Sequence, residues 1–355
     1  MGGWRSVLTD ELLRVQPTPG AHRVALRAGL SVGVPLIAVL LLGRPAWTSY
    51  AVFGAFTSLY GRNHVHLSRA AMQASAGAAL TVSVVLGVLA GSADSRDWLA
   101  VAGCCVVAGL GTLLSSVQDW HPPGPLFLVF AFGAVSSAPH HPGEVPVAAA
   151  VCVASVLFSL LVGNAGALLR RQVSLPTRLA PAWTWQPVRF VVAVGVAGAL
   201  ATALGAVLGV GHPYWAMVAA VAPLTARGIS RQMVRAGHRI LGTLLGLVTG
   251  AALLTLGLGP VATVLVVVVL QVLTELVVGR NYGLAMLLIT PMALLMGQLA
   301  SPRPAGSLLL DRGVETVVGG LVAIAIVLLE ESLRRRRTRS PSARPGHAEQ
   351  SSGEA

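Results

Sequence analysis

Long uninterrupted apolar runs are the feature that most constrains this chain. A helix rises 1.5 Å per residue, so about 20 apolar residues are needed to cross the ~30 Å hydrocarbon core of a bilayer. The runs that meet or approach this length are 24–42, 70–91, 98–114, 145–169, 188–210, 240–257 and 261–278. A helix satisfies its own backbone hydrogen bonds in lipid. The runs therefore predict an all-α, polytopic helical membrane protein.

The scarcity of charge argues against a soluble enzyme or a free nucleic-acid binder. Charged residues make up 11% of the chain, whereas soluble domains carry about 25%. The sequence has no paired-carboxylate motif on a loop and no lysine for a phosphate-binding loop. Its cysteines, Cys104, Cys105 and Cys152, have neither a disulfide pattern nor metal-ligand spacing. We expect no enzyme activity, no cofactor and no metal site.

An internal repeat organises the chain. The pattern G-x-P-x-W occurs at Gly43 and again at Gly211. Each copy follows a long apolar run and precedes a short apolar run, a basic loop and a Gly- and Ala-rich span. About twelve segments in two tandem six-segment halves are predicted. The expected divisions are an interfacial N-terminal segment (1–22), the first half (23–170), a cytoplasmic linker (171–187), the second half (188–331) and a disordered Arg-rich tail (332–355).

Arginine placement gives the orientation. The net charge is +12, and all 25 basic residues are arginines. They cluster at the N-terminus, after segments two and eight, in the linker and in the tail, whereas the loops 92–97, 136–143 and 257–260 are nearly free of them. Cytoplasmic loops are enriched in Lys and Arg, so both termini are expected in the cytoplasm, with the protein in the cell membrane. Arg303 and Arg312 are exceptions that fall on the outer side.

Four interrupted or short segments occupy matching places in the two halves. Segments two and eight are short, and segments five and eleven are flanked or broken by proline. Such pairs are typical of discontinuous helices that face a transporter's substrate. Tilted helices with polar ends would give the same pattern, and both readings stay open.

A row of arginines follows segment eight. Arg231, Arg235 and Arg239 lie four residues apart, along one drifting helix face. They anchor the protein to lipid phosphate, or they line a basic vestibule that draws an anionic substrate, because guanidinium pairs bidentately with carboxylate. Arg62 and Arg69 take the corresponding place in the first half.

Two glutamates are candidates for proton coupling. Glu275 lies four residues after Gln271 inside a span, and Glu315 opens the last one. A carboxylate at membrane depth costs about 2.5–3.5 kcal/mol on insertion scales and usually faces the bundle interior. Alternatively, Glu275 lies at the membrane interface near Arg280, and Glu315 is neutralised by Arg312.

The second half resembles a known family. The run R-I-L-G-T-L-L-G begins at Arg239, after a P-Y-W motif at Pro213 and before T-P at Thr290. The run R-G-V-E-T-V-V-G at Arg312 repeats the R-x-x-x-T-x-x-G spacing. Together they are similar to the FUSC family, the fusaric acid resistance and aromatic acid exporters. The residues that carry this likeness are Pro213, Trp215, Gly242, Thr243, Gly246, Arg312, Thr316 and Gly319.

The resemblance implies export of aromatic or other organic carboxylates, driven by the proton gradient. It also leaves a passive anion channel open, because a related plant group of anion channels has a similar membrane architecture. A non-transporting membrane interaction protein is the third alternative. The expected partners are membrane lipids and a small organic anion, without nucleic acid, and a homo-oligomer stays open.

Overall fold

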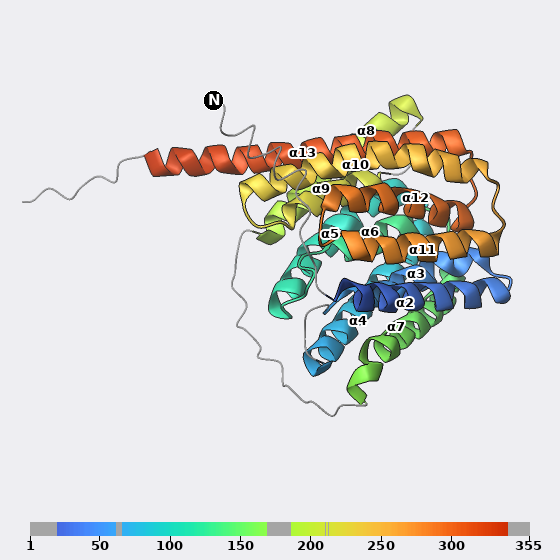
Figure 1. Cartoon of the computed structure of the whole chain (residues 1–355). Coiled ribbons are helices and arrows are strands. Elements are labelled where there is room, and N and C mark those ends of the chain that lie inside the picture. The colour runs from blue at the N-terminus through green and yellow to red at the C-terminus, as the bar shows by residue number, and fades with distance from the viewer. Residues whose placement is uncertain (1–19, 62–65, 169–185, 210, 212, 340–355) are drawn as a thin grey trace, which may run out of the picture.

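The architecture is a helical bundle, in which some helices run side by side across the view and others cross them obliquely (Figure 1). The structure is a computed structural model and describes residues 20–61, 66–168, 186–209, 211 and 213–339. Its first α-helices are α2 (Ala21–Leu41), α3 (Thr48–Ala55), α4 (His66–Gly91), α5 (Arg96–Val117), α6 (Leu126–Ser136) and α7 (Val145–Leu168). They are followed by α8 (Gln186–Leu208), α9 (Tyr214–Leu224), α10 (Ile229–Thr255), α11 (Pro260–Val277), α12 (Tyr282–Ala300) and α13 (Ala305–Arg339). Short 3-10 helices are η1 (Pro45–Trp47), η2 (Phe56–Leu59) and η3 (Pro142–Glu144).

Nine of the described helices are long and apolar enough to cross a membrane. They are α2, α4, α5, α7, α8, α10, α11, α12 and α13. The other three, α3, α6 and α9, have 8, 11 and 11 residues, too few for the ~20 that a full crossing needs. The chain is therefore a multi-pass helical membrane protein, in which nine of the described helices have the length of a span.

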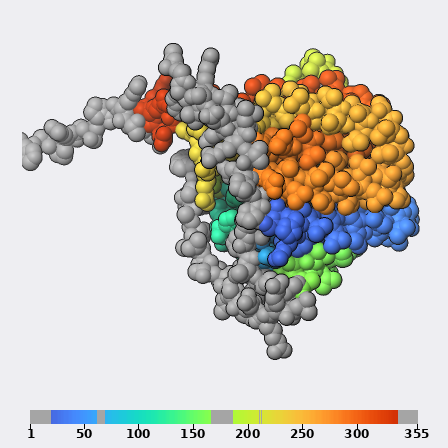
Figure 2. Space-filling view, viewed as in Figure 1, coloured from blue at the N-terminus to red at the C-terminus, as the bar shows by residue number. Residues whose placement is uncertain are grey.

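Helices that are far apart in the sequence pack closely together. α2 lies against α11, and α5 lies against α8, and Figure 2 shows the surface of α11 continuing onto that of α2. Glycines allow the first contact, since a Cβ at Gly29 would lie 2.6 Å from Val272 Cγ2 and one at Gly33 would lie 2.8 Å from Val268 Cγ2. Small residues let membrane helices approach in this way.

The helices within each half of the chain pack in a corresponding way. α4 packs against α6 and α7, and α10 packs against α12 and α13. The short helix α3 lies on α7, and the short helix α9 lies on α13. Leucines and valines on the outer faces are exposed, among them Leu26 of α2 and Val269 of α11, as expected for surfaces that lipid covers.

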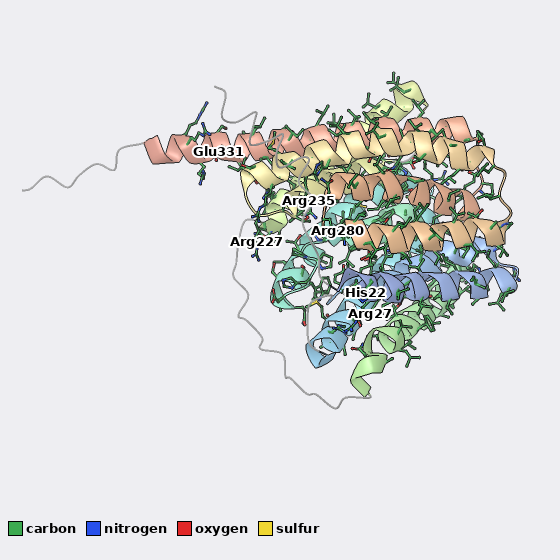
Figure 3. The ribbon with its side chains drawn as sticks, in the orientation of Figure 1. His22, Arg27, Arg227, Arg235, Arg280 and Glu331 are labelled. Carbon is green, nitrogen blue, oxygen red and sulfur yellow. The ribbon has the colours of Figure 1, made fainter. Side chains whose placement is uncertain are left out.

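Basic residues gather at one end of the bundle, which we call the basic end. Figure 3 shows His22, Arg27, Arg227, Arg235, Arg280 and Glu331 at this end, from which α13 projects. Arg189 of α8 pairs with Glu330 of α13 at 3.1 Å. Arg27 of α2 donates to the Gly163 carbonyl of α7 at 3.5 Å. The starts of α2 and α8 and the ends of α7 and α13 therefore lie together, and we call the other side of the bundle the opposite end.

The tail expected to be disordered from residue 332 is helical as far as Arg339. Glu331 explains part of this difference, because its carboxylate accepts hydrogen bonds from Arg334 Nε at 3.0 Å and Arg335 Nε at 2.6 Å. Such i,i+3 and i,i+4 pairs stabilise a helix, so α13 continues past the expected boundary at 331. The expected N-terminal segment (1–22) and linker (171–187) fall almost entirely outside the described residues.

Candidate functional site

A large cavity lies between the short helices. Its volume is about 1270 Å³. Side chains of α3, α6 and α9 line it, together with residues of α10, α11, α12 and α13. The lining includes Thr225 and Arg235 towards the basic end, and His140 and Arg303 towards the opposite end. The cavity therefore extends along much of the bundle.

One wall of the cavity is aromatic. Phe53 and Phe56 come from α3 and η2, and Phe127 and Phe130 come from α6. Ring centroids lie 5.2 Å apart for Phe53–Phe130 and 5.4 Å apart for Phe56–Phe127, both edge to face. Phe130 also reaches Trp215 of α9 at 5.3 Å. This wall offers flat apolar surfaces to an aromatic ring.

Two buried arginines also line the cavity. Arg239 of α10 and Arg312 of α13 are 4% and 1% exposed, and both line the cavity. Arg239 Nη1 donates to Tyr282 Oη at 3.3 Å. Arg312 Cζ lies 3.7 Å from the centre of the Trp215 ring, a cation–π contact. The two guanidinium groups are near enough to repel each other.

Both arginines have side-chain nitrogens that donate no hydrogen bond within the described part of the chain. Nε and Nη2 of Arg239 and Nε and Nη1 of Arg312 are buried, and none of them has a hydrogen-bond partner within the described part of the chain. Burying a charge without partners is costly, and here two like charges share one wall. An anion bound between them would supply the missing acceptors and add negative charge to that of Glu315, which already acts on Arg312.

The predicted vestibule arginines of α10 separate in the structure. Arg235 and Arg239 line the cavity, whereas Arg231 is exposed and lies outside the lining. Arg235 Nη1 donates to Thr225 Oγ1 at 3.0 Å, and its Cζ lies 4.9 Å from the centre of the Tyr282 ring. Tyr282 thus contacts one arginine through its ring and the next through its hydroxyl.

The first-half arginines take a different place. Arg69 donates from Nε to the Gly61 carbonyl at 3.1 Å and from Nη1 to the Gly163 carbonyl at 3.2 Å. It lies outside the cavity lining and satisfies backbone carbonyls near the end of α7. Arg62 lies outside the described residues.

The two predicted glutamates are both buried but sit differently. Glu275 is 5% exposed and lines the cavity, and its Oε1 accepts a hydrogen bond from Gln271 Nε2 at 3.1 Å. Glu315 is 1% exposed and lies one turn after Arg312, outside the lining. Of these two glutamates, only Glu275 could exchange a proton directly with the cavity.

The glycines of the two R-x-x-x-T-x-x-G runs lie at close helix contacts. A Cβ at Gly242 would lie 2.6 Å from Met286 Cβ of α12, and one at Gly246 would lie 2.7 Å from Thr290 Cβ. Gly319 of α13 meets the Ala216 backbone of α9. Thr243 and Thr316 are fully buried, and Pro213 is the N-cap residue of α9. Close packing at these positions holds Arg239 and Arg312 in the cavity wall.

Comparison with known protein families gives a match in this part of the chain. Residues 181–326 match the family model described as fusaric acid resistance protein-like. Over these residues the chain is similar to the FUSC family. The matched region spans α8 to α12 and most of α13, so it includes Trp215, Arg239 and Arg312. No curated protein and no solved structure matches the chain. The FUSC match and the apolar helices indicate a multi-pass membrane protein of transporter type.

Sequence reasoning missed two parts of the site. It placed Arg312 on the outer side as part of a motif, whereas the FUSC region buries it over Trp215. It also missed the aromatic wall, which comes from outside the matched region. The three-residue spacing of Phe53 with Phe56, and of Phe127 with Phe130, was the available signal, since such spacing puts both rings on one helix face.

Proposed function

We propose that this protein transports organic anions across the cell membrane through the central cavity. The observation that carries the proposal is the pair Arg239 and Arg312, whose buried N–H groups lack hydrogen-bond partners in the described structure. Preorganised guanidinium groups bind carboxylates through charge-assisted bonds. The FUSC match supports a transporter-type protein.

Aromatic carboxylates are the substrates that this cavity fits best. The basic wall suits a carboxylate, and the wall of Phe53, Phe56, Phe127 and Phe130 suits a ring. In such pockets a small number of polar groups fix the orientation of the ligand, and the apolar surface supplies most of the contact area. We therefore assign the ring to the aromatic wall and the carboxylate to Arg239 and Arg312.

Export driven by the proton gradient is part of the proposal. Glu275 is the first coupling candidate, because it is buried and reaches the cavity. Glu315, beside Arg312, is the second. Protonation of either carboxyl would change the net charge next to the arginines and hence the affinity for an anion.

We also propose two six-segment halves with both termini in the cytoplasm. In support, the packing of α4 with α6 and α7 corresponds to that of α10 with α12 and α13. The short helices α3, α6 and α9 would complete the twelve segments, and the basic end would face the cytoplasm. The exposed Arg231 would then contact lipid phosphate.

Transport of radiolabelled benzoate into inverted membrane vesicles tests the function. Arg239→Gln and Arg312→Gln each remove charge-assisted bonds of about 1.5–3 kcal/mol, so uptake should fall about ten- to a hundredfold at low substrate. Arg231→Gln, outside the cavity, is the matched control and should transport normally. Equal uptake by all four proteins would refute the site.

A passive anion channel is the second candidate, and the cavity lining at both ends favours it. Planar-bilayer recording separates the two. A channel gives anion current without a pH gradient, whereas a coupled exporter gives uptake that an uncoupler and Glu275→Gln both abolish. Uptake that survives both treatments would remove proton coupling.

A further inference from the structure

Three titratable side chains meet in the cavity wall towards the opposite end. They are Tyr50 of α3, His140 of the loop before η3, and Glu144 of η3. Tyr50 Oη donates to Glu144 Oε2 at 3.0 Å. His140 Nδ1 lies 2.9 Å from the same Glu144 Oε2 and 3.2 Å from Tyr50 Oη. None of these residues belongs to the arginine site or to the FUSC-matched region.

The hydrogen-bond geometry requires a proton between His140 and Glu144. His140 Nε2 lies 3.0 Å from the Val135 carbonyl oxygen, which can only accept, so Nε2 carries a hydrogen. Nδ1 then faces Glu144 Oε2, and two acceptors at 2.9 Å repel each other unless a proton lies between them. The single hydrogen of Tyr50 already points to Glu144 and cannot fill that place.

The loop that carries His140 is held at both sides. The His140 backbone N–H donates to the Gly91 carbonyl at the end of α4, at 3.2 Å. Glu144 Oε1 accepts from the His141 backbone N–H at 3.2 Å. The side chain of Tyr50 is almost fully buried, whereas that of Glu144 is 45% exposed. The cluster is therefore fixed in place yet open to protons from solution.

The other charged groups that line the cavity at this end have partners of their own. Within the described part of the cavity lining they are Arg96 and Asp97 at the start of α5, 3.9 Å apart, and Arg303 after α12, which is 3.1 Å from Asp311. Near η1, Arg44 lies over the Trp47 ring at 5.5 Å. His141 uses its Nδ1 to accept from the Gly143 backbone N–H at 3.1 Å.

We propose that Tyr50, His140 and Glu144 form a proton-binding site at the opposite end of the cavity. The site takes one proton from water and holds it between His140 Nδ1 and Glu144 Oε2. When the proton leaves, His140 Nδ1 and Glu144 Oε2 repel each other. The segment 137–144 then moves away from the cavity. Proton binding at this site does not depend on which substrate is transported. A role for the proton in transport rests on the function proposed above.

Nitrogen-15 NMR of histidine-labelled protein in nanodiscs tests the site directly. The His140 signals are identified by their loss in His140→Gln. In the wild type, Nε2 should stay protonated while Nδ1 titrates between pH 5 and 9. Glu144→Gln removes the carboxylate that faces Nδ1, so the Nδ1 proton should be lost at a lower pH than in the wild type. His141→Gln is the matched control and should leave the His140 titration unchanged.

The outcomes decide the proposal even if Glu144→Gln fails to fold. If the signals of the His140 ring in the wild type stay constant from pH 5 to 9, the proposal of an exchangeable proton at Nδ1 is overturned. So does an unchanged midpoint in folded Glu144→Gln. Benzoate flux separates this proposal from the transport function. An intact titration in a protein that moves no benzoate keeps the proton site and rejects the transport function.

Discussion

At the scale of single residues, the unusual feature is a pair of like charges buried in one wall. Arg239 and Arg312 are almost fully buried and repel each other. Trp215 and Tyr282 compensate in part, through a ring face under Arg312 and a hydroxyl that accepts from Arg239. An anionic ligand would compensate for the rest, which is why we place the substrate carboxylate here.

Trp215 should matter through its contact with Arg312. A desolvated cation–π contact is worth about 2 kcal/mol, so Trp215→Leu should raise the KM for benzoate by about tenfold or more if the contact positions the guanidinium. Trp215→Phe keeps a ring and should lose less. Initial uptake rates over a range of benzoate concentrations measure both, and equal KM values in the two variants would contradict a role for the ring.

At the scale of elements, the contact between α10 and α12 positions Arg239. Gly246 is in this contact, and a Cβ there would lie 2.7 Å from Thr290 Cβ and 3.0 Å from the Met286 carbonyl oxygen. Overpacking of this kind costs about 1–3 kcal/mol. Gly246→Ala should therefore lower the thermal unfolding midpoint in detergent by several degrees.

Gly297 provides the matched control for that experiment. It lies within α12, and a Cβ there would meet no atom within 4 Å. Gly297→Ala should keep or slightly raise the unfolding midpoint, because alanine favours the helix. A smaller effect at Gly246 than at Gly297 would show that the helix contact is looser than described.

The last turns of α13 give a second prediction at this scale. Glu331 accepts hydrogen bonds from Arg334 and Arg335, and those bonds support the helix beyond the bundle. Glu331→Gln should leave the bundle intact and speed amide hydrogen exchange in residues 332–339. Mass spectrometry after brief exchange measures this. Unchanged exchange would show that intrinsic helix propensity, rather than Glu331, stabilises the end of α13.

Sequence patterns predicted the elements better than they predicted the site. The apolar runs located the long helices because a span must be apolar throughout. They did not locate the end of α13, because side-chain pairs of Glu331 continue the helix into a polar stretch. Periodicity placed Arg235 and Arg239 together, but the exposure of Arg231 depends on where α10 leaves the bundle. The aromatic wall needs the packing of α3 against α6, which no local pattern encodes.

At the scale of the whole molecule, the basic end sets the expected orientation. Cysteine labelling with a membrane-impermeant maleimide in intact cells measures it. A Cys105→Ser background keeps unspecific labelling low, because Cys105 is half-buried whereas Cys104 and Cys152 are buried. Ser332→Cys at the basic end should be protected until the cells are opened. Leu258→Cys, between α10 and α11, should be labelled at once. The reverse pattern would invert the proposed topology.

The central claim is that one cavity joins a carboxylate site to an aromatic wall and carries its ligand across the membrane. Counterflow of radiolabelled benzoate in proteoliposomes of purified protein measures it most directly, with neutral benzamide as the competitor that lacks the charge. The account predicts counterflow that excess benzoate inhibits and benzamide does not, and that Arg312→Gln lowers by about tenfold or more. Counterflow that stays at the wild-type rate in Arg312→Gln, or that benzamide inhibits as strongly as benzoate, would contradict it.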